Sequence, residues 1–332
     1  MKAFIVDKYG KNEHVRAGEL PVPQIGERDV LVRIAASGVN PLDVKIKDGE
    51  FKIPLPYKTP FALGNDLAGV VERRGANATR FEVGDEVYAR PDKDRIGTLA
   101  EYIAISEDDL ALKPARLSMT EASSLPLVAL TAWQALAEKA DVQPGQRVLI
   151  HAGSGGVGTI AIQLAKHLGA YVATTASGSN TAMLRQLGAD QVIDYRTEKF
   201  DEILSNYDLV LDPLGPDNAL KSLNVLRKGG LVIGIGGPPD PDFATYLGKP
   251  LLRPVLALTS RKVRAAAKKR GVRYSFLFMR ASGDQLREIT ALVDTGTIRP
   301  VIDRTFDFAD TVAALDYVDS GRAKGKVVVT LA

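Results

Sequence analysis

The chain has 332 residues, of which 45% are hydrophobic and 25% are charged, and its formal net charge is +3. This length is typical of about two domains, and so small a net charge gives no reason to expect a nucleic-acid partner. The absence of cysteine excludes disulfides and thiolate zinc sites, and no apolar run is long enough to span a membrane. Because the first residues also lack a signal-peptide core, we expect a cytoplasmic protein.

The first third of the chain has the pattern of short strands separated by turns. Apolar stretches rich in β-branched residues end at glycine-containing turns. Strands of this length and spacing predict a small barrel or sandwich. The predicted strands span residues 30–36, 68–73, 86–89 and 99–105.

A helical region follows these strands. Ser118 stands three residues before Glu121, which is the spacing of a capping box. The helical pattern continues to about Ala140. Pro126 is expected to break or kink it, because proline has no backbone N–H to donate.

From Val148 the pattern changes to strands that alternate with helices. Such alternation predicts βαβ units and a parallel, doubly wound sheet. The predicted strands span residues 148–150, 171–175, 191–195, 208–212 and 230–236, with 274–279 as a candidate sixth strand. Helices predicted at 181–187, 284–294 and 308–320 and a strand at 326–330 complete the pattern.

A glycine-rich turn follows the strand at 148–150. Gly153, Gly155 and Gly158 form a Gly-x-Gly-x-x-Gly sequence, and a segment with helical periodicity comes next. Glycines let a backbone approach a pyrophosphate, and the helix N-terminus offers unpaired N–H groups. A tight turn without a ligand is the alternative, but the strand–turn–helix context favours dinucleotide binding.

The sequence after this turn also bears on which nucleotide binds. No acidic residue lies between Thr159 and Ala189, where an NAD site usually places a carboxylate on the ribose. A carboxylate about 4 Å from a 2′-phosphate would cost ~4 kcal/mol at an effective dielectric constant of 20. We therefore predict NADP(H) rather than NAD(H), with the polar segment 175–180 near the phosphate and Arg185 as a candidate cation. Capping of the next helix is the alternative role of these serines.

Other catalytic chemistries fit the histidines poorly. Ser154 lies in a strand-to-helix turn like that of a hydrolase nucleophile. The only later histidine, His167, is on the helix that follows and cannot reach the serine hydroxyl. His151 ends an apolar strand and is expected to pack in the core, and the histidines lack metal-ligand spacing.

A basic span precedes the candidate sixth strand. Residues 253–273 carry eight basic side chains and no acidic one. We interpret this span as a solvated helix face, with contact to an anionic lipid surface or a nucleic acid as the alternative. An exposed edge at 274–279 favours a homodimer joined by sheet extension.

Ordered motifs along nearly the whole chain resemble a known family. The motifs occupy residues 38–43, 64–71, 84–87, 130–132, 152–158, 187–190 and 325–328. Together they resemble the zinc-independent, quinone oxidoreductase-like branch of the medium-chain dehydrogenase/reductase superfamily, and most nearly its plant chloroplast-envelope enone/quinone reductases. The resemblance implies an α/β fold. Residues 1–117 and 270–332 would form a GroES-like β-barrel substrate domain, and 118–269 would form a Rossmann NADP-binding domain with a doubly wound parallel sheet.

The resemblance also implies roles for individual residues. The pyrophosphate would be held by Ser154, Gly155, Gly156 and Val157. The 2′-phosphate and its ribose would lie among Ser177, Asn180 and Tyr195. The nicotinamide end would be lined by Asn40, Thr131, Gly234, Ile235, Gly236, Phe276 and Phe278, with Lys326 also reaching the cofactor. Asp66 stands where zinc-dependent relatives carry a Gly-His-Glu ligand, so no metal is expected.

These observations lead to a hypothesis of hydride transfer from NADPH to a small electrophile, either a quinone or an enone. A hydrogen-bond donor would stabilise the enolate. The candidate catalytic donors are Asn40, Tyr57 and Lys45, with bound water or the nicotinamide ribose hydroxyl as alternatives. Two rivals remain open: a reductase of enoyl thioesters or haloacrylates, and a non-enzymatic protein whose nucleotide site regulates binding to RNA or a membrane.

Overall fold

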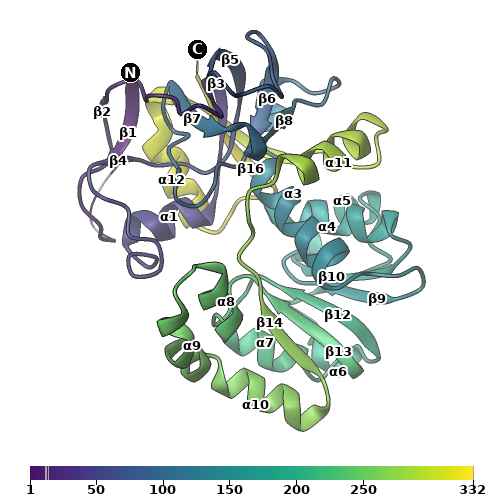
Figure 1. The fold of residues 1–332 in the computed structure, drawn as a ribbon. Coiled ribbons are helices and arrows are strands. Elements are labelled where there is room, and N and C mark those ends of the chain that lie inside the picture. The colour runs from purple at the N-terminus through teal and green to yellow at the C-terminus, as the bar shows by residue number, and fades with distance from the viewer. Residues whose placement is uncertain (12, 14, 332) are drawn as a thin grey trace. The chain divides into compact units, whose positions relative to one another are not determined.

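The computed structural model describes residues 1–11, 13 and 15–331, which fold into two compact units (Figure 1). The first unit comprises Met1–Leu130 and Arg280–Ala332, and the second comprises Thr131–Met279. The chain passes between the units thirteen and ten residues after the expected positions at 117 and 269. None of the described helices has the length and apolar composition of a membrane span.

The first unit is built mainly of antiparallel strands. Its strands are β1 (Lys2–Val6), β2 (Arg16–Glu19), β3 (Asp29–Val39), β4 (Phe61–Ala62), β5 (Leu67–Arg74), β6 (Glu86–Ala89), β7 (Tyr102–Ser106), β8 (Leu110–Leu112), β15 (Ile302–Asp307) and β16 (Lys326–Thr330). Its helices are α1 (Pro41–Asp48), α2 (Met119–Ser123), α11 (Gly283–Asp294) and α12 (Thr311–Asp319), with 3-10 turns at Glu107–Asp109 and Phe308–Asp310.

Strand β3 is the centre of this unit. It pairs with β5, β7 and β16, so nearly all of its residues are buried. The larger sheet has the order β15-β16-β3-β5-β6-β8, with β7 on β3, and a smaller sheet has the order β2-β1-β4. The strands predicted in this region are present. The one expected at 99–105 begins only at Tyr102, because Ala100 makes a single bridge to Ala3 instead of a ladder.

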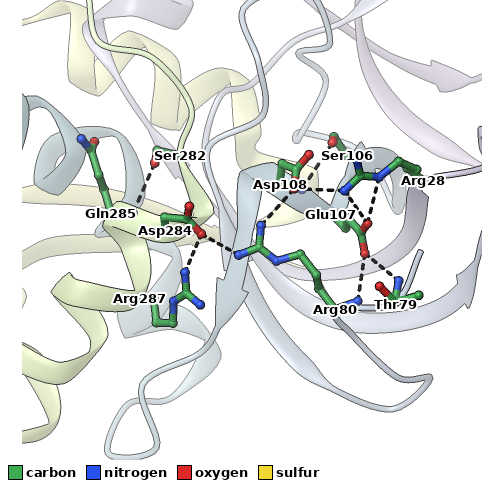
Figure 2. Close-up of polar contacts among 10 residues, drawn as sticks. All are labelled: Arg28, Thr79, Arg80, Ser106, Glu107, Asp108, Ser282, Asp284, Gln285 and Arg287. Atoms are coloured by element: carbon green, nitrogen blue, oxygen red, sulfur yellow. Dashed lines mark hydrogen bonds and ion pairs between the residues drawn. The ribbon is translucent and has the colours of Figure 1, made fainter. Parts of the chain in front are cut away.

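The C-terminal segment returns to this unit, as the resemblance implies. β16 pairs antiparallel with β3, and α11 is tied to the loops of the larger sheet by ion pairs (Figure 2). The Arg80 guanidinium lies 2.6 Å from the carboxylate of Asp284 on α11 and 2.9 Å from that of Asp108. Burial alone would raise the pKa of nearby Glu107, but the Arg80 and Thr79 N–H groups and an arginine guanidinium outweigh it and hold that pKa below its ordinary value.

The predicted helical region is divided at its proline. The Ser118–Glu121 capping box opens α2, because each residue accepts a hydrogen bond from the backbone N–H of the other. α3 (Pro126–Trp133) then begins at Pro126, a position where the missing N–H has no helical partner to lose. A π-helical stretch (Gln134–Lys139) ends the region at Ala140.

The second unit is a six-stranded parallel sheet in the described residues, with the order β11-β10-β9-β12-β13-β14. Its strands are β9 (Arg147–Ile150), β10 (Tyr171–Ala176), β11 (Gln191–Asp194), β12 (Tyr207–Asp212), β13 (Leu226–Gly234) and β14 (Arg273–Phe276). Its helices are α4 (Gly156–His167), α5 (Thr181–Gln186), α6 (Phe200–Ile203), α7 (Pro216–Ser222), α8 (Pro241–Tyr246), α9 (Arg253–Thr259) and α10 (Arg261–Arg270), with 3-10 turns at Gly178–Asn180 and Pro250–Leu252. The strand order reverses between β9 and β12, which is where ligands bind in such sheets.

Several elements have no counterpart among the predictions. They include the helices α1, α6, α7, α8 and α9 and the strands β2, β4, β8 and β15. In α1, Asn40 precedes the helix, Pro41 takes its first position, and the Asp43 carboxylate accepts the Asn40 N–H at 2.7 Å. This arrangement is a helix start that the sequence does carry.

Candidate functional site

The glycine corner, residues 152–158, joins β9 to α4. Ala152 has a φ of 52°, a left-handed conformation that is uncommon for a residue with a side chain. A Cβ on Gly158 would lie 2.5 Å from the Ala152 carbonyl oxygen, and one on Gly153 would lie 2.0 Å from Thr174 Oγ1. Gly155 is different, because its Cβ would come no closer than 3.3 Å to the Ala152 oxygen. Packing therefore requires glycine at 153 and 158, while Gly155 leaves the backbone open to a ligand.

The N-terminus of α4 adds an electrostatic feature to this corner. Gly155 is the residue before the helix and has no side chain with which to cap it. The first backbone N–H groups of this twelve-residue helix are therefore available to an anion, and the helix dipole favours negative charge there. Ser154, Gly156 and Val157 lie at this terminus and are partly exposed.

The polar loop after β10 lies at the same edge of the sheet, because neighbouring parallel strands end together. Asn180 donates its side-chain N–H to Ser177 Oγ at 3.1 Å, and Ser177 Oγ lies 3.1 Å from Ser179 Oγ. Ser177 precedes the 3-10 turn but makes no side-chain cap to it. The hydroxyls therefore bond to one another instead of to the helix.

An acidic residue that was missed from the sequence lies beside this loop. Asp194, at the end of β11, pairs in register with Ala176 and accepts the Gly178 N–H at 2.9 Å. The next residue, Tyr195, is 60% exposed, and the Arg196 guanidinium lies 5.9 Å from the centre of its ring. Asp194 could have been noticed in the sequence because it ends a predicted strand, although it lies beyond residues 159–189, where an acidic residue on the ribose is usual.

The ends of β12 and β13 complete the edge. The Ile235 N–H donates to the Asp212 carbonyl at 2.9 Å, and a Cβ on Gly236 would lie 2.2 Å from the Pro213 carbonyl oxygen. Gly234 is buried at the last position of β13. Burial raises the pKa of the Asp212 carboxyl to about 6, although the Leu214 N–H donates to it at 2.7 Å.

The two phenylalanines predicted near the nicotinamide belong to an aromatic cluster. Phe276 is buried with its ring centre 5.2 Å from that of Phe243 on α8. Phe278 lies 5.4 Å from Phe243 and 5.8 Å from Tyr246. Both rings therefore pack against α8, which is a core role.

A buried polar network lies in the first unit. The Lys326 ammonium donates to Asn40 Oδ1 at 2.5 Å, to Asp66 Oδ2 at 3.0 Å and to the Val39 carbonyl at 3.3 Å. Asn40 Nδ2 donates to Asp66 Oδ2 at 2.9 Å and to the Gly38 carbonyl at 3.3 Å. These bonds engage all three ammonium hydrogens and both amide hydrogens.

Two acidic side chains anchor the network. Asp66 Oδ1 accepts the Leu127 N–H at 2.7 Å and so caps the start of α3. Asp43, on α1, accepts the Asn40 N–H and the Asn65 side-chain N–H, both at 2.7 Å. Burial nonetheless raises the pKa of Asp43 to about 6. The network therefore fixes Asn40 through both its side-chain amide and its backbone N–H.

The residues of this network do not fit a zinc ion. Both oxygens of Asp66 are taken by the Leu127 N–H, the Asn40 amide and the Lys326 ammonium, a cation that would repel a metal. Among the residues that the structure describes, no group of three or more His, Asp or Glu side chains could hold a metal ion.

Tyr57, Lys45 and Thr131 were also predicted to be site residues. The Tyr57 hydroxyl donates to the Lys93 carbonyl at 2.7 Å, and burial raises its pKa above the ordinary value. Lys45 is a half-buried residue of α1, and Thr131 is buried on α3.

His151 is a core residue, as predicted. It is buried, and its ring nitrogens lie 2.9 Å from Thr175 Oγ1 and 3.0 Å from Ser222 Oγ. Its ring packs edge-on against Phe200, and burial lowers its pKa to about 3.

Comparison with known proteins identifies the family. Residues 26–115 match the model of the alcohol dehydrogenase GroES-like domain, and residues 187–329 match that of a zinc-binding dehydrogenase. Despite the name of the second model, the described residues offer no ligand set that fits a zinc ion.

Whole-length relatives agree with these matches. The chain is 37% identical to the mitochondrial NAD(P)H oxidoreductase RTN4IP1 of Mus musculus, over 100% of this chain and 89% of that protein. It is 35% identical to 2-methylene-furan-3-one reductase of Solanum lycopersicum, over 99% and 79%. The quinone oxidoreductase of Coxiella burnetii superposes with a TM-score of 0.88 at 31% identity, over 100% and 99%. The chain therefore belongs to the medium-chain dehydrogenase/reductase superfamily, with a GroES-like unit, a Rossmann-like unit, and quinone and enone oxidoreductases among its relatives.

Proposed function

We propose that the protein is a zinc-independent, NADPH-dependent oxidoreductase that reduces quinones or α,β-unsaturated carbonyl compounds by hydride transfer. The observation that carries this proposal is the glycine corner, where Gly155 leaves the backbone open at the uncapped N-terminus of a twelve-residue helix. An anion such as a pyrophosphate gains both N–H donors and a favourable dipole at such a place. Relatives named as quinone and enone reductases support the choice of acceptor.

The preference for NADP(H) rests on the loop beside the corner. Hydroxyl and amide groups of Ser177 and Asn180 can donate to a 2′-phosphate, and the Arg196 guanidinium beside Tyr195 supplies a cation. The Asp194 carboxylate repels a phosphate, but the hydrogen bond from the Gly178 N–H partly neutralises the charge of this carboxylate. We assign the 2′-phosphate contact to Arg196, because it lies on the segment that follows Asp194.

We assign two roles to the predicted residues of the first unit: holding the site in place, and donating a hydrogen bond to the acceptor carbonyl. When bound, a reduced nicotinamide supplies the hydride. Asn40 positions the site, because its amide hydrogens and oxygen are already engaged by Asp66, Gly38 and Lys326. Lys45 makes no side-chain hydrogen bond or ion pair among the described residues, so its ammonium N–H groups are available to a substrate. We assign polarisation of the acceptor carbonyl to Lys45, with the Tyr57 hydroxyl, which is bonded to Lys93, as the second candidate.

A kinetic panel tests the proposal. NADPH oxidation is followed with an enone, an ortho-quinone, an enoyl thioester and a haloacrylate, each with and without protein. We expect turnover with the enone or the quinone to exceed that with the other two acceptors. Turnover confined to the thioester would assign the protein to the enoyl reductase alternative, and no turnover with any acceptor would contradict the proposal.

Paired variants test the assigned donor. Lys45→Met should lower kcat by about 100-fold, the lower range of general acid catalysis, while leaving the NADPH Kd unchanged. Tyr57→Phe is the matched comparison. A larger loss of kcat in Tyr57→Phe would transfer the role to the tyrosine.

A further inference from the structure

The charge of this molecule is concentrated in one stretch of the second unit. Residues 243–279 contain nine Lys or Arg side chains and no acidic residue. Because the whole chain has a net charge of +3, the remaining 295 residues carry a net charge of −6. The molecule is therefore strongly polarised, and this stretch is the part that an anionic surface would attract.

An apolar stripe adjoins this charge. Leu251 is 91% exposed, Val255 56% and Leu258 69%. Their spacing of four and three residues places them on one side of the 3-10 turn at Pro250–Leu252 and of α9, which follows it. No residue of α9 is fully buried: Val255 and Leu258 face solvent, and Leu256 and Ala257 are half-buried. A merely solvated helix face would carry polar residues at these positions.

Helix α10 follows α9 directly and supplies the cations (Figure 1). Val263 and Ala267 hold it against the sheet, and the basic side chains project outward. Apart from Arg270, which donates to Asn224 Oδ1 at 3.1 Å, the exposed basic residues of α10 are Arg261, Lys262, Arg264, Lys268 and Lys269. Among the described residues, none of these five makes a side-chain hydrogen bond or an ion pair with an acidic group, so their charges are not neutralised within the protein.

A cationic cavity of about 410 Å³ lies along the flank of α10. Arg264 and Lys268 of α10, Arg273 at the start of β14, and Lys139 line it, and no acidic residue does. Four cations around one cavity fit a phosphate group.

We propose that the surface formed by α9 and α10 docks the protein onto an anionic lipid bilayer. The apolar stripe would enter the boundary between headgroups and acyl chains, and the cations would contact lipid phosphates. A second copy of the chain is disfavoured, because an isologous contact would bring two equally basic surfaces together. A nucleic acid is disfavoured because residues 247–273 contain no aromatic side chain on which a base could stack.

Co-sedimentation with vesicles tests the docking. The full chain, without cofactor, is mixed with phosphatidylcholine vesicles and with vesicles in which about one third of the lipid is phosphatidylglycerol. We expect binding only to the anionic vesicles, and loss of that binding in 1 M salt, where the Debye length falls to about 3 Å. Each basic residue near such a surface contributes roughly fivefold to the partition coefficient, so Arg261→Glu/Lys262→Glu should lower it at least about 25-fold.

Matched variants separate specific docking from general charge and hydrophobicity. Leu251→Ser/Leu258→Ser should weaken binding, whereas Val83→Ser/Leu112→Ser, which alters exposed apolar residues of the first unit, should not. Lys11→Glu/Arg73→Glu changes the net charge equally and should retain most of the binding. Equal loss in the two charge variants would overturn the proposal, because it would show attraction without a defined surface.

Three other results would also overturn it. They are no binding of the folded wild-type chain to anionic vesicles, tighter binding to single-stranded RNA than to those vesicles, and salt-resistant self-association that the Leu251→Ser/Leu258→Ser variant abolishes. Turnover of a soluble enone is measured on every variant and should not change. If the wild-type chain turned over the enone but did not bind the anionic vesicles, the docking alone would be refuted; if it bound the vesicles but did not turn over the enone, the proposed function alone would be refuted.

Discussion

The glycine corner and the Asn40–Asp66–Lys326 network differ in how their geometry is specified. The corner is local: four of the six residues 153–158 are glycines, and those at 153 and 158 let the backbone and Thr174 approach closely. The network is not local, because Lys326 and Asn40 are 286 residues apart and meet only when β16 pairs with β3. A site made by leaving atoms out can be recognised from a short sequence, whereas a site made by pairing buried charges depends on the whole fold.

The largest expected effect is the removal of one charge from the network. Lys326→Met leaves the buried Asp66 carboxylate without its cation and should destabilise the protein by about 3–5 kcal/mol. The urea-unfolding midpoint measures the loss, with exposed Lys324→Met as the control. The double variant Lys326→Met/Asp66→Asn should recover part of it. No recovery would show that packing of the lysine, not charge pairing, dominates.

The two kinds of glycine in the corner should respond differently to alanine. Gly158→Ala forces a Cβ to within 2.5 Å of a carbonyl oxygen, so it should destabilise the fold by about 1–3 kcal/mol and abolish NADPH binding. Gly155→Ala brings a Cβ only to 3.3 Å from the Ala152 oxygen, a tight contact that a small shift relieves, so it should nearly keep the melting temperature while raising the NADPH Kd by about tenfold or more. Thermal melts and calorimetry measure both variants, and equal destabilisation by the two would contradict the distinction.

Two buried carboxyls, one near the glycine corner and one in the network, allow the pH dependence of stability to be compared between the two regions. The pKa of Asp212, near the corner, is about 6, above the ordinary value of 3.8, so its ionisation opposes folding. Its contribution to stability is greatest below pH 4 and is lost as the pH rises through 6. Asp212→Asn should therefore stabilise the protein at pH 8 by on the order of 1–3 kcal/mol, and the gain should vanish toward pH 4.

Asp43 has the same raised pKa of about 6 but a different setting. It accepts two N–H donors, from Asn40 and Asn65, and an asparagine would turn an N–H group toward one of them. Asp43→Asn should thus bring no gain at pH 8. Melting curves from pH 4 to 8 for both variants provide the check, and a similar gain in both would remove the contrast.

The smallest expected effect concerns the nucleotide preference. Arg196→Ala should weaken NADPH about tenfold and leave NADH unchanged, because only NADPH carries the 2′-phosphate. Asp194→Asn should shift the ratio of the two Kd values modestly the other way, toward NADPH. Arg185→Ala is the matched control. A larger effect at Arg185 than at Arg196 would move the phosphate contact to the earlier arginine.

Hydrophobic periodicity and the glycine and proline residues between segments predicted most of the fold. The predicted strands of both units are found within a few residues of their expected positions, because the apolar, β-branched runs of β3 and β5 and the glycine turns between strands are local signals. Helix α9 was missed because its apolar residues are not buried, so no amphipathic pattern marks it. β15 was missed because none of its residues is fully buried and four of the six are polar, so it shows no apolar run.

The candidate site could be predicted only where it is local. The glycine corner follows from its own sequence. Asp194 lies beside the 177–180 loop only through the register of β10 and β11, which the linear sequence does not display. Likewise, nothing near Lys326 in the sequence indicates that three acceptors consume its hydrogens.

Calorimetric titration with NADPH, with Gly156→Asp alongside the wild type, shows whether a dinucleotide lies over the glycine corner. A carboxylate at the start of α4 would repel a pyrophosphate placed over the corner. We expect saturable binding of one NADPH per chain by the wild type and loss of that binding in the folded variant. Equal affinity in both proteins, or no binding of NADPH or NADH by the wild type, would contradict this expectation.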